Sequence, residues 1–155
     1  MNAILHAARF LGLTDRKLKR GVLSRQPLTM LRLEWRGDRV EADWIIRPPD
    51  YWDLGMSAQQ VAERQAEQAL TDALAVRELV FEAFPAISGA HLRAFRPDAK
   101  RRLELVILGR ADRMQEGLGR VSSVTMRAQL AGFEFSLLDG VLTGFEEDKN
   151  RVKGA

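Results

Sequence analysis

A regular alternation of apolar and charged residues over residues 28–47 constrains the fold more than any other feature of this sequence. Apolar side chains occupy every second position on both sides of a Gly-Asp dipeptide at 37–38, a period typical of β-strands with one covered face. A two-residue loop with glycine first predicts a hairpin closed by a type II′ turn. The apolar positions are Leu31, Leu33, Trp35, Val40, Ala42, Trp44 and Ile46.

This turn also predicts which residues lie opposite one another. The apolar pairs are Trp35–Val40, Leu33–Ala42 and Leu31–Trp44, and the pairs on the other face are Arg32–Asp43, Glu34–Glu41 and Arg36–Arg39. Like charges directly opposite each other are destabilising. The diagonal ion pairs that would offset them are Arg36–Glu41 and Glu34–Arg39. Because one face is polar and the other apolar, we expect an antiparallel sheet that is covered on one side only.

A long helix is predicted over about residues 57–84. Ser57 and Gln60 match the capping-box pattern of a helix start, and Pro85 would end the helix. Small residues recur in steps of four and three along it and are flanked by larger apolar ones, a pattern that favours packing on a sheet over a coiled coil. These small positions are Ala62, Ala66, Ala69, Ala73, Val76, Val80 and Ala83.

Similar patterns predict the remaining elements. They are a helix at 2–12 ending at Gly12, a second hairpin from 91–96 and 101–109, a helix at 111–131 broken at 117–119 and capped again by Ser122 or Ser123, and a third hairpin from 133–138 and 141–145. Asp139-Gly140 in the third hairpin is a strong turn signal. The predicted fold class is α+β, with a single antiparallel sheet built from three hairpins and helices packed on one face.

Length and charge indicate one domain with a basic N-terminal arm. A chain of 155 residues fits a single domain of ordinary size. Residues 1–25 carry six basic and one acidic side chain, a net charge of +5, whereas the rest carries 18 basic and 20 acidic, a net charge of −2. We expect a basic helix and arm at 1–25, one α+β domain with a weak tandem ββα pattern at 26–146, and a flexible tail at 147–155.

Several kinds of chemistry lack the residues they need. Cysteine is absent, and the only histidines, His6 and His91, have no nearby metal-ligand partners in the sequence. We expect His91 to be a surface or core histidine and not a catalytic base. No local motif supplies a nucleophile with its base, so we expect no cofactor, no metal site and no enzymatic activity. No apolar run approaches the ~20 residues of a membrane span and the N-terminus lacks a secretory signal, which predicts a cytoplasmic protein.

Two segments carry candidate binding residues. The loop after the first hairpin places two aromatic rings side by side, which suits recognition, although rings folded over the sheet edge are an alternative. Its residues are Asp50, Tyr51, Trp52 and Asp53. The second segment is the basic arm, which would neutralise phosphates or serve as a plain solvated connector. Its charged residues are Arg16, Lys17, Lys19, Arg20 and Arg25.

Three functions remain open. We expect an interaction or assembly module that binds a protein partner, or a second copy of itself as a homodimer, through the polar sheet face or exposed hairpin edges. The first alternative is binding of nucleic acid or an anionic membrane surface through residues 1–25. In the membrane case the side chains of Ile4, Leu5 and Leu11 would insert into the lipid. The second is a small-molecule or enzymatic pocket under the long helix, which a cavity lined by His91, Asp50 or Asp53 would favour.

Overall fold

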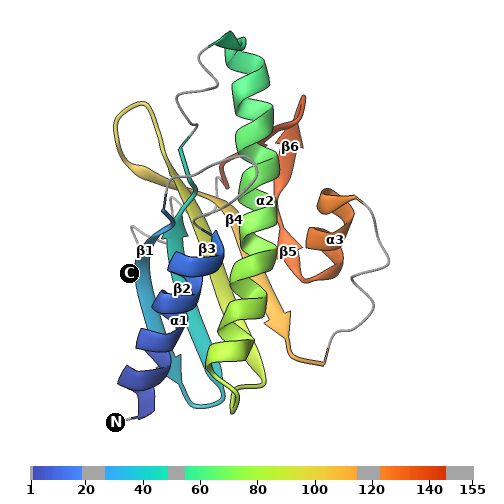
Figure 1. Ribbon diagram of the computed structural model, residues 1–155. Helices are drawn as coiled ribbons and strands as arrows, with labels where there is room; N and C mark the ends of the chain where they lie inside the picture. Colours follow the sequence, from blue (N-terminus) through green and yellow to red (C-terminus); the bar gives the residue numbers. More distant parts are fainter. Residues whose placement is uncertain (1, 19–26, 49–54, 115–122, 146–155) are drawn as a thin grey trace.

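The computed structural model describes residues 2–18, 27–48, 55–114 and 123–145. These segments form three helices and seven strands (Figure 1). In chain order the elements are α1 (Asn2–Leu18), β1 (Thr29–Arg36), β2 (Arg39–Ile45), α2 (Ala58–Ala83), β3 (Gly89–Pro97), β4 (Leu103–Asp112), α3 (Val124–Leu130), β5 (Phe133–Glu134), β6 (Ser136–Leu138) and β7 (Val141–Thr143).

The main sheet is mixed, which corrects the prediction of a single antiparallel sheet. Its order is β1-β2-β3-β4-β5, and β2 pairs with β3 in parallel, with Arg39 opposite Gly89. The pairs β1–β2, β3–β4 and β4–β5 are antiparallel. The third hairpin forms as β6–β7 but is a separate two-stranded sheet. The α+β class is confirmed, whereas the predicted sheet of three antiparallel hairpins is wrong.

The long helix causes the parallel pairing. A tight turn produces antiparallel neighbours, whereas a helix that crosses back over the sheet delivers the chain to the next strand in the same direction. Here α2 runs back along the sheet between β2 and β3 (Figure 1). At the start of both strands, the Ser88 N–H donates to the Asp38 carbonyl at 2.8 Å. The inference from one polar face to antiparallel pairing overlooked this crossover.

The first hairpin has the predicted register over most of its length. Arg36 lies opposite Arg39, and the predicted pairing holds as far as the position opposite Asp43. Gly37 has a φ of 62°, as the first position of a type II′ turn requires. A bulge then shifts the register, so that Trp44 lies opposite Met30 instead of the predicted Leu31.

The predicted long helix is confirmed as α2. The Ser57 hydroxyl accepts from the Gln60 N–H at 3.2 Å, and the Gln60 side chain accepts from the Ser57 N–H at 3.1 Å, which completes the capping box. At the other end, Arg113 donates to the carbonyls of Phe81 and Phe84. The small residues face the core as predicted, and the buried ones are Ala66, Ala69, Ala73, Val76, Val80 and Ala83.

Other boundaries differ from the prediction. Helix α1 continues through Gly12 to Leu18, because a glycine weakens a helix without ending it when later residues are packed, and Leu18 is buried. Ala111 belongs to strand β4 and not to a helix, while Ser123 caps α3 as predicted. The predicted break at 117–119, residues 19–25 of the arm and the whole predicted tail lie outside the described residues.

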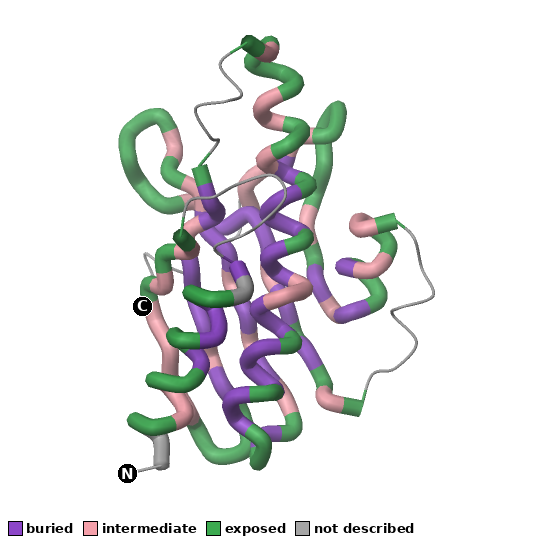
Figure 2. Tube along the Cα trace, in the orientation of Figure 1, coloured by how far each residue is buried: buried purple, intermediate pink, exposed green. Residues whose placement is uncertain are grey.

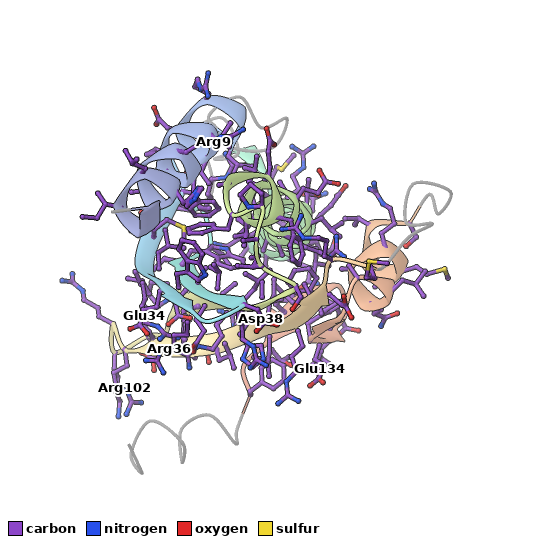
Figure 3. The ribbon with its side chains drawn as sticks, turned by 90° about the horizontal axis from the view of Figure 1, so that it is seen from below. Arg9, Glu34, Arg36, Asp38, Arg102 and Glu134 are labelled. Carbon is purple, nitrogen blue, oxygen red and sulfur yellow. The ribbon has the colours of Figure 1, made fainter. Side chains whose placement is uncertain are left out.

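The two faces of the main sheet are chemically different. The helices α1 and α2 cover one face, where Phe10, Trp44 and Leu70 join the apolar core (Figure 2). The opposite side of the sheet carries charged side chains, among them Glu34 and Arg36, and lies away from the helices (Figure 3). We call this charged side the outer face. Among the helices that the structure describes, none has the length and apolar character that crossing a membrane demands.

A buried polar cluster joins α1, α2 and the segment after β2. The side chains of Arg47 and Asp72 are each 1% exposed, and the Arg47 Nε donates to Asp72 Oδ2 at 2.7 Å. Arg47 also donates to the carbonyl of Leu18, the last residue of α1. Gln68 donates to Asp72 at 2.6 Å. Burial raises the pKa of the Asp72 carboxyl, and the Arg47 guanidinium opposes that shift.

Candidate functional site

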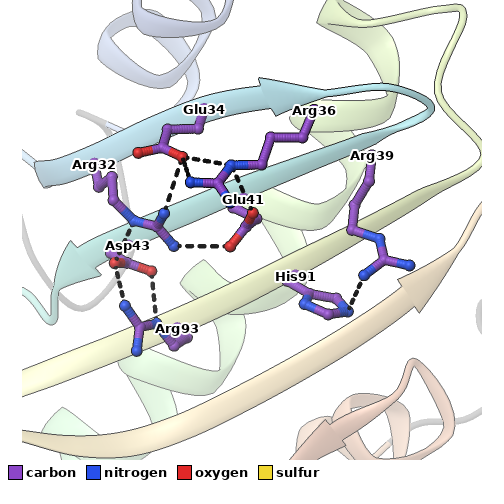
Figure 4. A network of polar contacts seen from close by, with 8 residues as sticks. All are labelled: Arg32, Glu34, Arg36, Arg39, Glu41, Asp43, His91 and Arg93. Atoms are coloured by element: carbon purple, nitrogen blue, oxygen red, sulfur yellow. Dashed lines mark hydrogen bonds and ion pairs between the residues drawn. The ribbon is translucent and has the colours of Figure 1, made fainter. Parts of the chain in front are cut away.

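The outer face is built by the same alternation that builds the core. Successive side chains of a strand point to opposite faces, so the residues between the core positions point outward. In the middle of β1, β2 and β3 these residues are charged or titratable (Figure 4), whereas Ile45 and Phe95 toward one end of the face are apolar. Leu108 and Arg110 extend the face onto β4. The residues drawn in Figure 4 are Arg32, Glu34, Arg36, Arg39, Glu41, Asp43, His91 and Arg93.

The charges on β1 and β2 are largely paired with one another. The ion pairs are Arg32–Glu34 (3.2 Å), Arg32–Glu41 (3.1 Å), Arg32–Asp43 (2.9 Å), Arg36–Glu34 (2.6 Å) and Arg36–Glu41 (3.3 Å). The predicted diagonal pair between Arg36 and Glu41 is therefore confirmed. The predicted pair between Glu34 and Arg39 is wrong. Glu34 binds Arg32 and Arg36, and the Arg39 side chain contacts His91 on β3.

Asp43 is the most buried carboxylate of this network, with 7% of its side chain exposed. Arg93 binds both of its oxygens, through Nε to Oδ1 at 2.9 Å and through Nη2 to Oδ2 at 2.7 Å. Burial on its own would raise the pKa of Asp43, but the hydrogen bonds from Arg93 and Arg32 hold it below the ordinary value. Asp43 therefore stays ionised and neutralises charge from the arginines on both sides.

Arg39, His91 and Arg110 form a second group, which we call the cationic cluster. His91 lies opposite Arg110 in the sheet, and the Arg39 Nη1 lies 3.1 Å from the His91 Nε2. Within the described segments, neither Arg39 nor Arg110 contacts a carboxylate. Because a guanidinium can only donate, this contact needs a neutral imidazole whose Nε2 accepts. The cluster therefore holds two permanent positive charges that contact no carboxylate of the described residues.

An open depression of about 480 Å³ lies on the outer face beside this cluster. Its lining residues are Arg32, Glu41, His91, Arg93, Leu108 and Arg110. Arg32 and Arg93 in this lining pair with Asp43, and Arg32 also pairs with Glu41. Arg110 is the lining arginine that contacts no described carboxylate, and its charge attracts anions. The depression lies on the side of the sheet away from α2, so it is not the predicted pocket under the long helix, although His91 lines it.

The protonation of His91 responds to these neighbours. Partial burial lowers the pKa of His91, and the charges of Arg39 and Arg110 lower it further, against the opposing effect of Glu41. The ring is therefore neutral at physiological pH. This is the state in which its Nε2 can accept the hydrogen bond from Arg39.

Replacing Arg110 with glutamine should raise the pKa of His91, because removing a nearby positive charge favours the imidazolium. The His91 Hε1 resonance, followed by NMR across pH, measures this shift. His6 packs on the Trp35 ring on the other side of the sheet and provides a reference signal. Arg9→Gln removes one exposed charge from α1 and should leave the His91 titration unchanged. Equal shifts in both variants would show that net charge alone sets this pKa.

The structure describes only part of the predicted sites. The loop residues Asp50, Tyr51, Trp52 and Asp53 lie outside the described residues, as do Lys19, Arg20 and Arg25 of the arm. Arg16 is exposed on α1, and Lys17 lies within that helix. The prediction that these residues bind a partner or a phosphate backbone therefore stays a prediction.

Sequence reasoning missed Arg39, Arg93 and Arg110 as site residues and considered His91 only as a lining residue of a pocket under the long helix. A signal was present, because His91, Arg93 and Arg110 at outward positions of the second hairpin are basic or imidazole, with Leu108 as an apolar neighbour, whereas the outward positions of the first hairpin include three acids. Placing Arg39 beside His91 required the knowledge that β2 and β3 are neighbours.

Guanidinium groups suit anions, because they bind carboxylates and phosphates in fixed geometry. Across the described ranges, no three His, Asp or Glu side chains converge as metal ligands would. The outer face thus offers binding of an anion as its main chemistry. Comparisons with family models, with curated proteins and with solved structures found no match for this chain.

Proposed function

We propose that this protein is a non-enzymatic interaction module that binds an acidic surface of a protein partner across the outer face of its sheet. The observation that carries the proposal is the cationic cluster, in which Arg39 and Arg110 have no carboxylate partner among the described residues. An acidic partner would supply the missing carboxylates. Such complementary charges speed association and select the partner.

The surroundings of the cluster support this role. Within the described part of the chain the outer face carries no helix, because α1 and α2 pack on the opposite side of the sheet (Figures 1 and 3). The ion pairs from Asp43 to Arg32 and Arg93 hold two further guanidiniums in place beside the depression. Side chains that are ordered before binding lose less conformational entropy when the partner arrives.

Nucleic acid fits the outer face less well. Proteins that bind single strands stack bases on exposed aromatic rings. On these strands, Phe95 is 7% exposed and lies beneath the Arg93 guanidinium at 5.2 Å, so it offers no free ring. Binding of nucleic acid or anionic lipid through the basic arm remains the alternative proposal.

The outermost position of β1 favours self-association as a second candidate. Among the described strands, β1 has a neighbour on one side only, and a free strand edge can pair with another chain. A bulge at Leu31 and the charges of Arg32 and Glu34 oppose such pairing. Sedimentation equilibrium tests self-association, and a strictly monomeric protein would rule out the homodimer. Binding of an acidic partner is therefore the first proposal.

Replacing Arg39 and Arg110 together with glutamine should weaken binding of a poly-glutamate peptide about tenfold, because each exposed charge pair contributes up to ~1 kcal/mol. Isothermal titration calorimetry at low salt measures the affinity. Binding to the wild-type protein should also weaken as salt is added, because exposed charges are screened.

The matched control removes the same net charge from the helix side. Arg9 is exposed on α1 and Arg64 on α2, and the variant R9Q/R64Q should keep the affinity of the wild type. Equal losses in both double variants would mean that the peptide responds to net charge alone, which would contradict a site on the outer face.

Binding through the basic arm is better tested by substituting its charged residues than by deleting the arm. Phe10, Leu13 and Leu18 of α1 are buried in the core, so removing residues 1–25 would disturb the fold. A variant with glutamine at the five predicted arm positions keeps these apolar contacts. Loss of DNA, heparin or anionic-vesicle binding in that variant, with R39Q/R110Q unaffected, would assign the function to the arm.

A further inference from the structure

The cationic cluster distinguishes between kinds of anion. Arg39 and Arg110 carry permanent charges, and His91 can take up a third by protonation. The carboxylate nearest to His91 across the strand is that of Glu41, which Arg32 and Arg36 already bind. A ligand carboxylate carries one charge, whereas a phosphate monoester carries about −1.5 to −2 near neutral pH. The charge of the cluster therefore matches a phosphate better than a carboxylate.

We propose that the cationic cluster is a binding site for a phosphate monoester, carried either by a phosphorylated side chain of the partner or by a small phosphorylated molecule. This inference rests on the proposed function, since it names the group that the outer face recognises. Arg39 and Arg110 each donate to phosphate oxygens. His91 lies between β2 and β4, the strands that carry these two arginines, and can donate to a third oxygen once it is protonated.

Binding at this site takes up a proton. In the free protein, Arg39 donates to the His91 Nε2, which requires the neutral ring. A phosphate that draws Arg39 to itself releases the Nε2, and its negative charge favours protonation of that nitrogen. The groups that face His91 are Arg39 and Glu41 on β2, Arg93 on β3 and Arg110 on β4. A bound dianion offsets the positive charges in this set, so the pKa of His91 rises.

Titration with inorganic phosphate, followed through the two histidine resonances by NMR, tests the site directly. We expect the His91 signal to shift and its pKa to rise, while the His6 signal stays in place. The R39Q/R110Q variant should lose this response, and R9Q/R64Q should retain it. These four arginines are exposed surface residues, and far-UV circular dichroism confirms that each variant is folded.

Two peptides that differ only in phosphoserine or glutamate at one position identify the source of the phosphate. The phosphopeptide should bind about tenfold more tightly than the glutamate peptide, because phosphate offers more charge and more acceptor oxygens. If the phosphopeptide binds more tightly than free O-phosphoserine, the site recognises a phosphorylated protein partner. If the phosphopeptide and O-phosphoserine bind equally, the site recognises a small phosphorylated molecule.

Failure of this inference can be told from failure of the proposed function. If poly-glutamate binds through Arg39 and Arg110 but inorganic phosphate leaves His91 unchanged, the phosphate site is wrong and the acidic partner stands. If neither probe binds, both are wrong. Equal movement of the His6 and His91 signals would show a non-specific effect of phosphate and would also overturn the site.

Discussion

Replacing Asp72 with alanine is expected to lower the free energy of unfolding by about 3–5 kcal/mol, because it removes the buried carboxylate to which two nitrogens of the Arg47 guanidinium donate. Both side chains are 1% exposed, so water cannot take over the role of the carboxylate. Gln68 loses its acceptor as well. Urea denaturation followed by circular dichroism measures the loss.

The double variant Arg47→Met with Asp72→Leu separates the ion pair from simple loss of packing. Apolar replacements of similar volume remove both buried charges, and we expect the double variant to be more stable than Asp72→Ala alone. Some cost remains, because the Leu18 carbonyl loses its donor. If the double variant were as unstable as the single one, the cluster would contribute through packing and not through charge.

Replacing Gly132 with alanine should also destabilise the protein strongly. Gly132 has a φ of 98°, and an added Cβ would lie 2.2 Å from the backbone carbonyl oxygen of Arg110. The strained conformation alone costs about 1–3 kcal/mol, and the clash adds to it. Since the Arg110 N–H donates to the Gly132 carbonyl, we also expect the His91 resonance opposite Arg110 to move. Thermal unfolding and NMR measure the two effects.

Gly12→Ala is the matched control for this substitution. Gly12 lies within α1, and an added Cβ there would meet no atom within 4 Å. Alanine in a helix interior is favoured over glycine by about 0.5–1 kcal/mol, so this variant should gain stability. A loss of stability in both variants would mean that local backbone conformation does not explain the expected effect at Gly132.

Local patterns in the sequence predicted the hairpins and the long helix. The Gly37-Asp38 turn predicted most of the β1–β2 register, and Ser57 with Gln60 predicted the start of α2. Asp139-Gly140 predicted the β6–β7 turn, and both residues have positive φ, as a type I′ turn requires. In each case the interaction that decides the structure joins residues close in the chain.

The errors arose where distant segments meet. Nothing local in β2 or β3 marks them as parallel neighbours, because the direction of β3 is set by the crossover of α2. At the bulge, Met30 and Leu31 are adjacent apolar residues, so the alternation is interrupted in the sequence as well, a signal that the predicted register did not use. The candidate site shows the same division between local and distant contacts. Its ion pairs lie mainly within the first hairpin and could be predicted, whereas the cationic cluster forms only when β2, β3 and β4 lie side by side.

The parallel junction between β2 and β3 also affects when the cationic cluster can exist during folding. Each hairpin can form from residues close in the chain, but Arg39 and His91 are 52 residues apart, and contacts across such separations close slowly and late. An intermediate with both hairpins formed but not yet joined would lack the cluster. Binding of the anionic partner would therefore select the completed sheet over its partly folded forms, and the ligand would stabilise the native chain by mass action.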